Sequence, residues 1–295
     1  MPSRDPVAGR HCALLGRPVA HSLSPVLHQA AYARLGLDWS YEAIEVDEAG
    51  LPALVRGLDG SWRGLSLTMP LKRAVLGLAD RVSATARVVG VANTLVQDAP
   101  GRWAAHNTDV PGIVAALRER DAVPSGRTAV VGGGATAVSV LAALARLGVA
   151  EPEVYVRSPR RADEVGRVAG RLSVHPVLRS WDEVDEALEA DLVVSTTPAG
   201  ATDALAERLA AGRLPGRVLF DVVYAPWPTR LAAAWKQRGG TVLGGLDLLV
   251  HQAVLQVRLF TGRDVAVALL RAAGEAALAR PTPVDGGTGA ARSSP

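Results

Sequence analysis

The sequence predicts an α/β protein of two domains with a cleft between them. Its 295 residues are enough for about two domains that each bury a core. Apolar runs of strand length alternate with Ala- and Leu-rich runs of helix length along most of the chain. This alternation is typical of parallel sheets that are covered by helices on both faces. We therefore expect two such sheets, one in each half of the chain.

The predicted elements follow one another in a consistent order. In the first half we expect strands at 12–15, 41–46, 65–68 and 92–96, with helices at 25–35, 51–58 and 71–79. The second half alternates more regularly, with strands at 128–131, 153–156, 192–195 and 218–221 and helices at 135–147, 160–169 and 203–210. Two further helices are predicted at 246–260 and 265–279.

The last two helices predict a discontinuous first domain. They follow the glycine turn at 244–245, and we expect them to return to the first half of the chain. Residues 10–108 and 246–280 would then form one domain, and residues 109–245 the other. The polar or Pro- and Gly-rich stretches 1–9 and 281–295 are predicted to be flexible.

The composition excludes several classes of function. The net charge of +3 is small and its basic residues are dispersed, without the cluster that a nucleic-acid surface needs. No apolar stretch reaches the roughly 18 residues of a membrane span. The single cysteine, Cys12, excludes an internal disulfide and fits a reducing cytoplasm. We therefore expect a cytoplasmic protein. It is also expected to be a monomer or homodimer and to act on a small molecule.

A glycine-rich loop predicts a dinucleotide site. It stands between the strand at 128–131 and an Ala-rich helix, which is the context that the Gly-x-Gly-x-x-Gly/Ala fingerprint requires. Gly132 would form the tight turn, Gly134 would let the backbone approach a pyrophosphate, and Ala137 would let helix and strand pack closely. We expect a Rossmann-like, doubly wound domain rather than a purely structural turn. The predicted contacts are Gly132, Gly133, Gly134, Ala135, Thr136 and Ala137, together with Thr196 farther along the chain.

The end of the next strand predicts which dinucleotide binds. An NAD site places an Asp or Glu there, which accepts a hydrogen bond from the ribose 2′-hydroxyl. Here the strand is followed by Arg157, Ser158, Arg160 and Arg161, which suit a 2′-phosphate. A solvated basic helix start is the alternative, but cations are disfavoured near the positive end of a helix dipole. The sequence therefore predicts NADP(H) as the cofactor.

Lys72 is the candidate acid/base. Of 32 basic residues only Lys72 and Lys236 are lysines. An arginine cannot give up its proton at ordinary pH, whereas the proton affinity of a lysine responds to its surroundings. Lys72 follows an apolar strand and a turn that contains a proline. From this stretch alone, an exposed lysine at a helix start is an equal alternative.

Two serines precede the first helix. Ser24 before Pro25 predicts a helix start, with Ser24 as the N-cap. Ser22 adds a second hydroxyl beside the same positive helix end, and the two together suggest a small carboxylate site.

Other polar residues are ambiguous when taken one at a time. Asp109 can cap the helix that runs to residue 120, and Asn93 can be a turn residue. His21 and His28 lack the partners and spacing of a metal pair. No metal site is predicted.

Taken together, these stretches resemble the shikimate dehydrogenase family over residues 12–262. The motifs are Gly-x-Pro-x-x-His-Ser-x-Ser-Pro at 16–25, Thr-x-Pro-x-Lys at 68–72, Asn-Thr-Leu at 93–95, Asn-Thr-Asp at 107–109, the glycine loop at 132–137, Asp-Val-Val-Tyr at 221–224 and Leu-Val-x-Gln-Ala at 249–253. Their shared order is far more specific than any one motif. Members of this family reduce 3-dehydroshikimate to shikimate with NADPH, on the route to chorismate and the aromatic amino acids, and the resemblance implies that activity here.

The resemblance implies a role for each matching residue. Lys72 and Asp109 match the catalytic pair. Ser22 and Ser24, with Tyr224 nearby, would hold the substrate carboxylate. The remaining substrate contacts would come from Lys72, Asn93, Asp109 and Gln252, with Thr68 and Ser66 assisting.

Three stretches depart from the family pattern. Ser66 replaces an asparagine, and its shorter side chain reaches less far. Val156 replaces the asparagine that usually follows the second cofactor strand, so that one polar contact to the adenosine end is expected to be missing. Asp247 and Leu248 replace Gly-Met, which removes a flexible side chain expected near the nicotinamide.

The chemistry of a hydride transfer suits these residues. As hydride reaches the ketone carbon, the developing alkoxide needs a nearby cation and then a proton, and Lys72 can supply both. A neighbouring Asp109 favours the charged lysine, so proton donation by Lys72 and by water remain alternatives. A quinate/shikimate dehydrogenase that prefers NAD is a second hypothesis, and a non-catalytic sensor of shikimate-like ligands is a third. The presence of both Lys72 and Asp109 speaks against the sensor.

Overall fold

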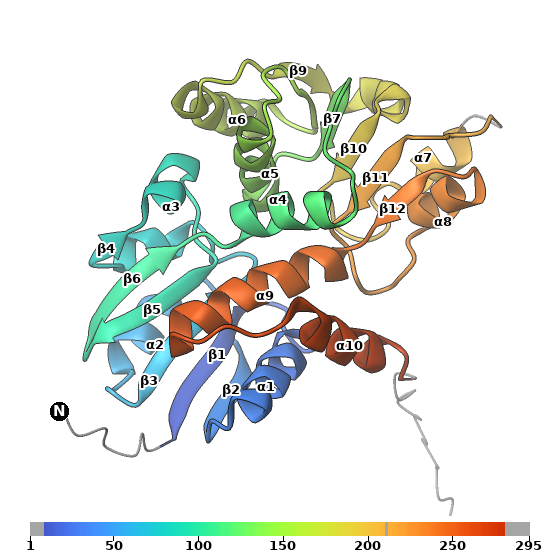
Figure 1. The fold of residues 1–295 in the computed structure, drawn as a ribbon. Coiled ribbons are helices and arrows are strands. Elements are labelled where there is room, and N and C mark those ends of the chain that lie inside the picture. The colour runs from blue at the N-terminus through green and yellow to red at the C-terminus, as the bar shows by residue number, and fades with distance from the viewer. Residues whose placement is uncertain (1–8, 210–211, 281–295) are drawn as a thin grey trace, which may run out of the picture.

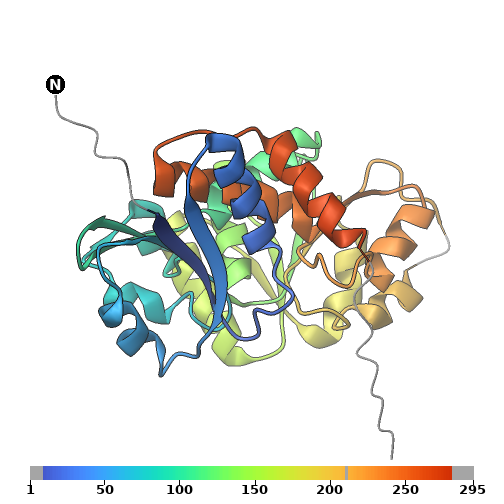
Figure 2. The ribbon, with the colours of Figure 1, turned by 90° about the horizontal axis from the view of Figure 1, so that it is seen from below.

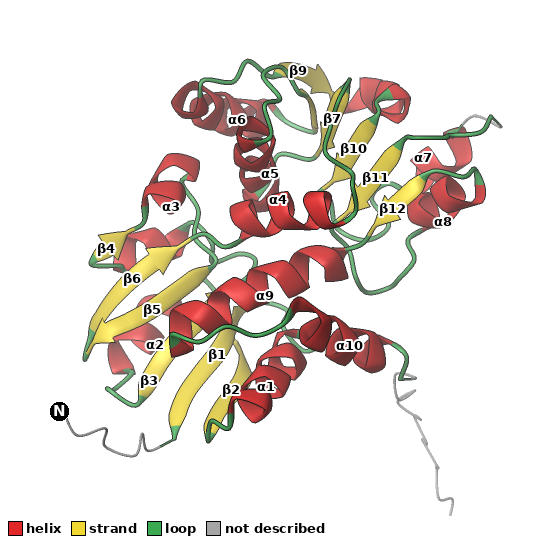
Figure 3. Ribbon diagram, in the orientation of Figure 1, coloured by secondary structure: helices red, strands yellow, loops and turns green. Residues whose placement is uncertain are grey.

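The computed structural model describes residues 9–209 and 212–280, which form two α/β domains side by side (Figure 1). Each domain is built on a six-stranded sheet with helices around it (Figure 3). The predicted fold class is confirmed. None of the helices in the described ranges is both long and apolar enough to cross a membrane. Of the stretches predicted to be flexible, 1–9 and 281–295, all but Gly9 lie outside the described residues, and so does Ala210 at the end of a predicted helix.

The first sheet has the strand order β2-β1-β3-β5-β6-β4. Its strands are β1 (Arg10–Gly16), β2 (Trp39–Glu45), β3 (Trp62–Leu67), β4 (Arg81–Val82), β5 (Thr94–Ala99) and β6 (Arg102–His106). β1 pairs in parallel with β2 and β3, but β5 runs antiparallel to both β3 and β6. The expectation of a wholly parallel sheet is therefore wrong for this domain. Pro100 and Gly101 join β5 to β6, and Gly101 has a φ of +72°, so the connection is a tight hairpin that only antiparallel strands can form.

The second sheet is parallel throughout, with the order β12-β11-β10-β7-β8-β9. Its strands are β7 (Thr128–Val131), β8 (Glu153–Val156), β9 (Val177–Ser180), β10 (Leu192–Ser195), β11 (Val218–Asp221) and β12 (Thr241–Leu243). The four strands predicted here coincide with β7, β8, β10 and β11, whereas the edge strands β9 and β12 were not predicted. The direction of winding reverses beside β7, and open α/β sheets bind ligands at the carboxyl ends of the strands at such a point.

Helices surround both sheets. Those of the first half and the C-terminus are α1 (Ser24–Leu35), α2 (Leu51–Gly57), the 3₁₀ helix η1 (Ala74–Leu78), α3 (Ala84–Val89), α9 (Gly245–Thr261) and α10 (Val267–Leu278). The others are α4 (Asp109–Glu119), α5 (Ala135–Arg146), α6 (Pro159–Leu172), the 3₁₀ helix η2 (Trp181–Glu189), α7 (Asp203–Arg208) and α8 (Arg230–Gln237).

The helix predicted at 71–79 begins later than expected. Lys72 lies in a turn, and only Ala74–Leu78 is helical, as η1. The carbonyl of Lys72 accepts a hydrogen bond of 2.8 Å from the N–H of Ala92, so it is not available to a helical bond. This contact holds the turn that contains Lys72 against the start of β5, the strand that follows Ala92.

Helices α4 and α9 run side by side between the two sheets (Figures 1 and 2). A Cβ on Gly112 of α4 would lie 3.2 Å from the backbone nitrogen of Gln252 on α9, so the glycine permits this close approach. α10 then packs on α1, where Leu27, Phe260 and Leu270 share one buried cluster. The domain limits at 108/109 and 245/246 stay a prediction.

Candidate active site

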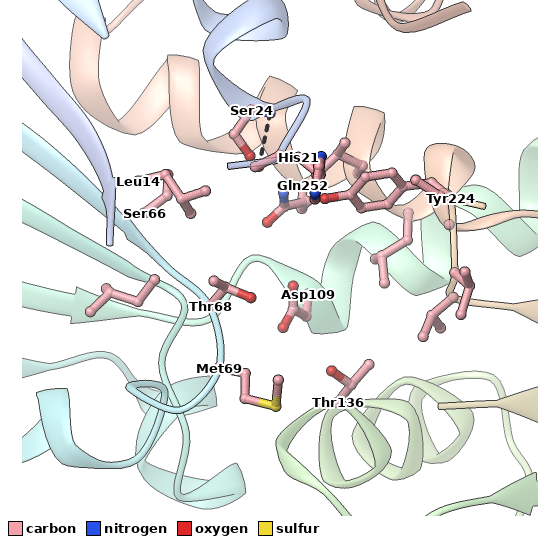
Figure 4. A pocket seen from close by; sticks show the side chains of 18 of the residues that line it. Leu14, His21, Ser24, Ser66, Thr68, Met69, Asp109, Thr136, Tyr224 and Gln252 are labelled. Atoms are coloured by element: carbon pink, nitrogen blue, oxygen red, sulfur yellow. Dashed lines mark hydrogen bonds between the residues drawn. The ribbon is translucent and has the colours of Figure 1, made fainter. Parts of the chain in front are cut away.

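A cavity of about 440 Å³ lies between the two sheets, and side chains from both domains line it (Figure 4). It contains all but one of the residues predicted to bind or transform a substrate. These are Ser22, Ser24, Ser66, Thr68, Lys72, Asp109, Tyr224 and Gln252. Thr136, from the predicted cofactor loop, also lines it. The cavity therefore joins the predicted substrate residues to the start of α5.

Lys72 and Asp109 form an ion pair in this cavity. Lys72 Nζ lies 2.7 Å from Asp109 Oδ2, and the two side chains are only 15% and 4% exposed. Asp109 is the first residue of α4, where a carboxylate is favoured by the helix dipole. It does not cap that helix, since the N-cap residue is Thr108. Lys72 is thus neither a surface lysine nor part of a helix.

Asn93 is the predicted substrate residue that does not line the cavity. It is buried, and its Nδ2 lies within 2.9 Å of oxygens of Thr108 and Gln252 and 2.7 Å from Asp109 Oδ1. Its Oδ1 accepts from the N–H of Thr108 at 2.8 Å. The Asn93 amide therefore fixes Asp109 through Oδ1, so that Asp109 Oδ2 is turned toward Lys72.

The serine pair lies at the start of α1 but does not cap it as expected. The N-cap residue is Leu23, and Ser24 is the first helical residue without a side-chain cap bond. The expectation that Ser24 caps the helix is wrong because Ser22 accepts from the N–H of Ser24 instead, at 3.2 Å. Both side chains line the cavity with Tyr224. Burial raises the pKa of the Tyr224 phenol, although its hydrogen bonds to Ser22 and Leu23 act in the opposite direction, so the phenol is protonated and can donate.

Ser66 belongs to a buried hydrogen-bonded group that sequence reasoning did not predict. Tyr41 donates to the Ser66 hydroxyl at 2.7 Å, and Ser66 donates to Gln256 Oε1 at 3.0 Å. His28 Nε2 lies 3.2 Å from the same Gln256 oxygen, and its ring stacks on that of Tyr41 with centroids 4.1 Å apart. Burial lowers the pKa of His28 to about 4, so His28 is neutral at physiological pH.

The glycine loop between β7 and α5 is shaped for a close ligand. Gly132 has a φ of +114°, and a Cβ there would lie 2.5 Å from Thr196 Oγ1. A Cβ on Gly134 would meet nothing within 4 Å, and the first turn of α5 has no side-chain cap. Backbone N–H groups therefore face open space at the positive end of a helix. These residues fit a pyrophosphate, with no side chain in its place.

The predicted 2′-phosphate residues lie at the start of α6. Ser158 is its N-cap residue, and the Arg157 guanidinium stacks over the ring of Trp181 at 4.2 Å from the centroid. Arg161 Nη1 lies 2.8 Å from Glu164 Oε2, and Arg160 Nε lies 3.8 Å from Glu164 Oε1. Two partners of these arginines, Trp181 and Glu164, were not predicted.

Comparison with known proteins agrees with this geometry. The model of the shikimate dehydrogenase substrate binding domain matches residues 14–95, and that of the shikimate 5′-dehydrogenase C-terminal domain matches residues 245–273. The NADP(+) shikimate dehydrogenase of Rubrobacter xylanophilus is 38% identical over 271 residues, which cover 88% of this chain and 93% of the relative. This chain belongs to the shikimate dehydrogenase family.

Solved structures of the shikimate dehydrogenase family share the fold. The Mycobacterium tuberculosis shikimate dehydrogenase superposes with a TM-score of 0.81 and 41% identity, over 90% of this chain and 99% of that chain. The Thermus thermophilus enzyme, solved in complex with NADP(H) and shikimate, gives a TM-score of 0.79 and 34% identity over 91% of this chain and 100% of that chain.

The departures from the pattern of shikimate dehydrogenases have structural counterparts. Leu248 lines the cavity at the position of the usual methionine. Asp247 turns away from the cavity. Its carboxylate accepts from the N–H of Gly244 at 2.9 Å and pairs with Arg120 at 3.0 Å and Arg271 at 2.7 Å. Asp247 thus caps α9 and ties it to α4 and α10.

Within residues 9–209 and 212–280, no three His, Cys, Asp or Glu side chains are grouped so that they could hold a metal ion. The polar chemistry of the cavity rests on hydroxyls, amides and the Lys72–Asp109 pair.

Proposed function

We propose that this protein is an NADP-dependent shikimate dehydrogenase, which reversibly reduces 3-dehydroshikimate to shikimate with hydride from NADPH. The observation that carries the proposal is the Lys72–Asp109 ion pair of 2.7 Å. It lies in a cavity that extends from Ser22 and Ser24 to Thr136 at the start of α5. A substrate carboxylate and a reactive ketone can therefore be held at opposite ends of one space, beside the dinucleotide loop.

The pair supplies the charge that the reaction needs. Bound NADPH supplies the hydride to the ketone carbon, and negative charge then develops on the ketone oxygen. Lys72 Nζ is the cation of the pair on a side chain only 15% exposed, so it stabilises that oxygen more than it would in bulk solvent. Asp109, held by Asn93, fixes the direction of the ammonium group. The proton comes from Lys72 or from water that Lys72 binds.

The other cavity residues account for orientation of the substrate. Ser22, Ser24 and the protonated Tyr224 offer hydroxyl donors to a carboxylate. Thr68 and Gln252 line the wall next to the pair and suit ring hydroxyls. Asn93 contributes through Asp109 and Gln252, because its amide donates to both.

Turnover by the purified protein tests this function. We expect shikimate-dependent formation of NADPH from NADP⁺, and we expect Lys72→Ala to lower kcat by about 100-fold or more while the protein keeps its fold. Lys236→Ala is the matched control, since it removes the other lysine, which is exposed on α8. No NADPH formation with shikimate would reject the proposal, and a Lys72→Ala variant as active as the wild type would reject the role of the pair.

Location and assembly stay proposals. We propose a cytoplasmic enzyme, a monomer or homodimer, and the single buried cysteine, Cys12, supports a reducing compartment.

A further inference from the structure

Glu164 on α6 is a buried carboxylate surrounded by arginines. Its side chain is 9% exposed, and three arginine side chains lie within 4 Å of it. Arg160 and Arg161 come from the same helix. The third is Arg73, which comes from the other domain and lies 91 residues away in the sequence, with its Nη2 3.0 Å from Glu164 Oε2.

The Arg73 side chain therefore reaches from the turn that contains Lys72 to α6, in the domain that carries the glycine loop. Arg73 directly follows Lys72 in the sequence and is 34% exposed. Burial lowers the pKa of Arg73, the charge of Glu164 raises it, and the charges of Arg161, Arg167 and Arg160 lower it again. More positive than negative charge thus gathers around Glu164, and the local field attracts a further anion.

The anion expected there is the cofactor phosphate. Arg161 packs directly against the glycine loop, because a Cβ on Gly133 would lie 2.9 Å from Arg161 Cβ. The guanidinium of this same Arg161 is held by Glu164 at 2.8 Å. An unneutralised Glu164 would hold Arg161 more tightly and would repel a nearby phosphate.

We propose that Arg73 is a specificity-determining residue for NADP, because it neutralises Glu164 across the interdomain cleft and leaves Arg161 available to the 2′-phosphate. Arg73 acts through Glu164 and is a positioning residue. The inference rests on the proposed NADP-dependent function. It adds that the domain that carries Lys72 also contributes to the choice of cofactor.

Equilibrium titration of the full-length protein with NADP⁺ and with NAD⁺, without substrate, tests this inference. We expect Arg73→Met to weaken NADP⁺ binding about tenfold, or about 1.4 kcal/mol, because the charge of Glu164 is then balanced only by Arg160 and Arg161, the arginines expected to meet the phosphate. NAD⁺ has no 2′-phosphate, so its Kd is expected to change less than about twofold. Arg73→Lys keeps the charge and is expected to stay within about threefold of the wild type for NADP⁺.

Neutralising Glu164 should remove the need for Arg73. We expect Glu164→Gln to bind NADP⁺ as tightly as the wild type or more tightly. The double variant Arg73→Met/Glu164→Gln is expected to match Glu164→Gln within about twofold. Arg81→Met is the matched control, because Arg81 also pairs with a single carboxylate, that of Asp98, but within the first sheet. This control is expected to leave both Kd values unchanged.

Several outcomes would overturn the inference. A double variant that retains the tenfold loss would show that Arg73 acts without Glu164, and equal losses for both cofactors would show a purely structural role. If Arg73→Met does not fold, weaker NADP⁺ binding by Glu164→Gln is enough to reject the inference. If the wild type reduces NADP⁺ with shikimate but Arg73→Met binds NADP⁺ normally, this inference is rejected and the proposed function stands. A wild type without any preference for NADP⁺ would reject the inference together with the proposed cofactor.

Discussion

Tyr41 donates a buried hydrogen bond of 2.7 Å to Ser66, the residue that stands where relatives are expected to have asparagine. Ser66 in turn donates to Gln256, whose Nε2 lies 3.4 Å from Gln252 Oε1. Gln252 accepts from Asn93, which also donates to the Asp109 carboxylate. The short side chain at position 66 is therefore part of a continuous polar group that extends from β2 to the ion pair.

The Tyr41–Ser66 bond predicts coupled losses of stability. Tyr41→Phe and Ser66→Ala should each lower the free energy of unfolding by about 1–2 kcal/mol, because each leaves a buried polar partner unsatisfied. The double variant should lose less than the sum of the two. Denaturant unfolding measures this, with Ser40→Ala as the control, since the Ser40 hydroxyl makes a hydrogen bond of similar length, 2.7 Å, to His11 at an exposed position. Strict additivity would contradict the coupling.

Asp109→Asn should impair catalysis more than substrate binding. The substitution keeps the shape of the side chain and its contact to Asn93 but removes the charge that orients Lys72. We expect kcat to fall by about 10²- to 10³-fold with a smaller change in KM. Steady-state kinetics with shikimate and NADP⁺ test this. The control is Asp264→Asn, which removes a carboxylate of an exposed pair with Arg258, and activity near that of the wild type in Asp109→Asn would refute the prediction.

Two glycines of the cofactor loop should respond differently to alanine. Gly132→Ala places a methyl group against Thr196 at a positive φ and should lower the free energy of unfolding by about 1–3 kcal/mol. Gly134→Ala meets no atom within 4 Å and should keep nearly wild-type stability. It should nevertheless weaken NADP⁺ binding, because the methyl group enters the space for the pyrophosphate. Thermal unfolding and NADP⁺ titration separate the two effects, and tight NADP⁺ binding by Gly134→Ala would contradict this geometry.

His28 should make the protein less stable in weak acid. Its pKa is about 4 in the folded protein against an ordinary 6.5, so the unfolded chain binds the proton more readily. The stability that His28 contributes is fully present above pH 6.5 and is lost as the pH falls from 6.5 through 4, with a loss of about 3 kcal/mol once the pH is below both values. Urea unfolding from pH 7 to pH 4 should show a shallower decline for His28→Gln than for the wild type. His175→Gln, at an exposed histidine, should decline as the wild type does, and equal slopes for all three proteins would exclude this role of His28.

Much of the second domain could be predicted because its signals are local. The buried strands β7, β8, β10 and β11 are short apolar runs, and the glycine loop stands between a strand and a helix. The strands β4, β6, β9 and β12 have two to five residues and lack a comparable apolar run. Their pairing depends on the neighbouring strand, and the β5–β6 hairpin was not predicted, although the Pro100-Gly101 turn is a local signal that could have indicated it.

The sequence by itself determined the alternation of strands and helices, the cofactor loop and the family motifs, because each depends on residues close together in the chain. Only the tertiary structure decided between an exposed Lys72 and one paired inside the cavity, since Asp109 lies 37 residues away in the sequence and is held in place by Asn93. The same holds for Arg73 and Glu164, which belong to different domains. Ion pairing between distant residues depends on a separation of a few ångströms, and only the folded chain sets that separation.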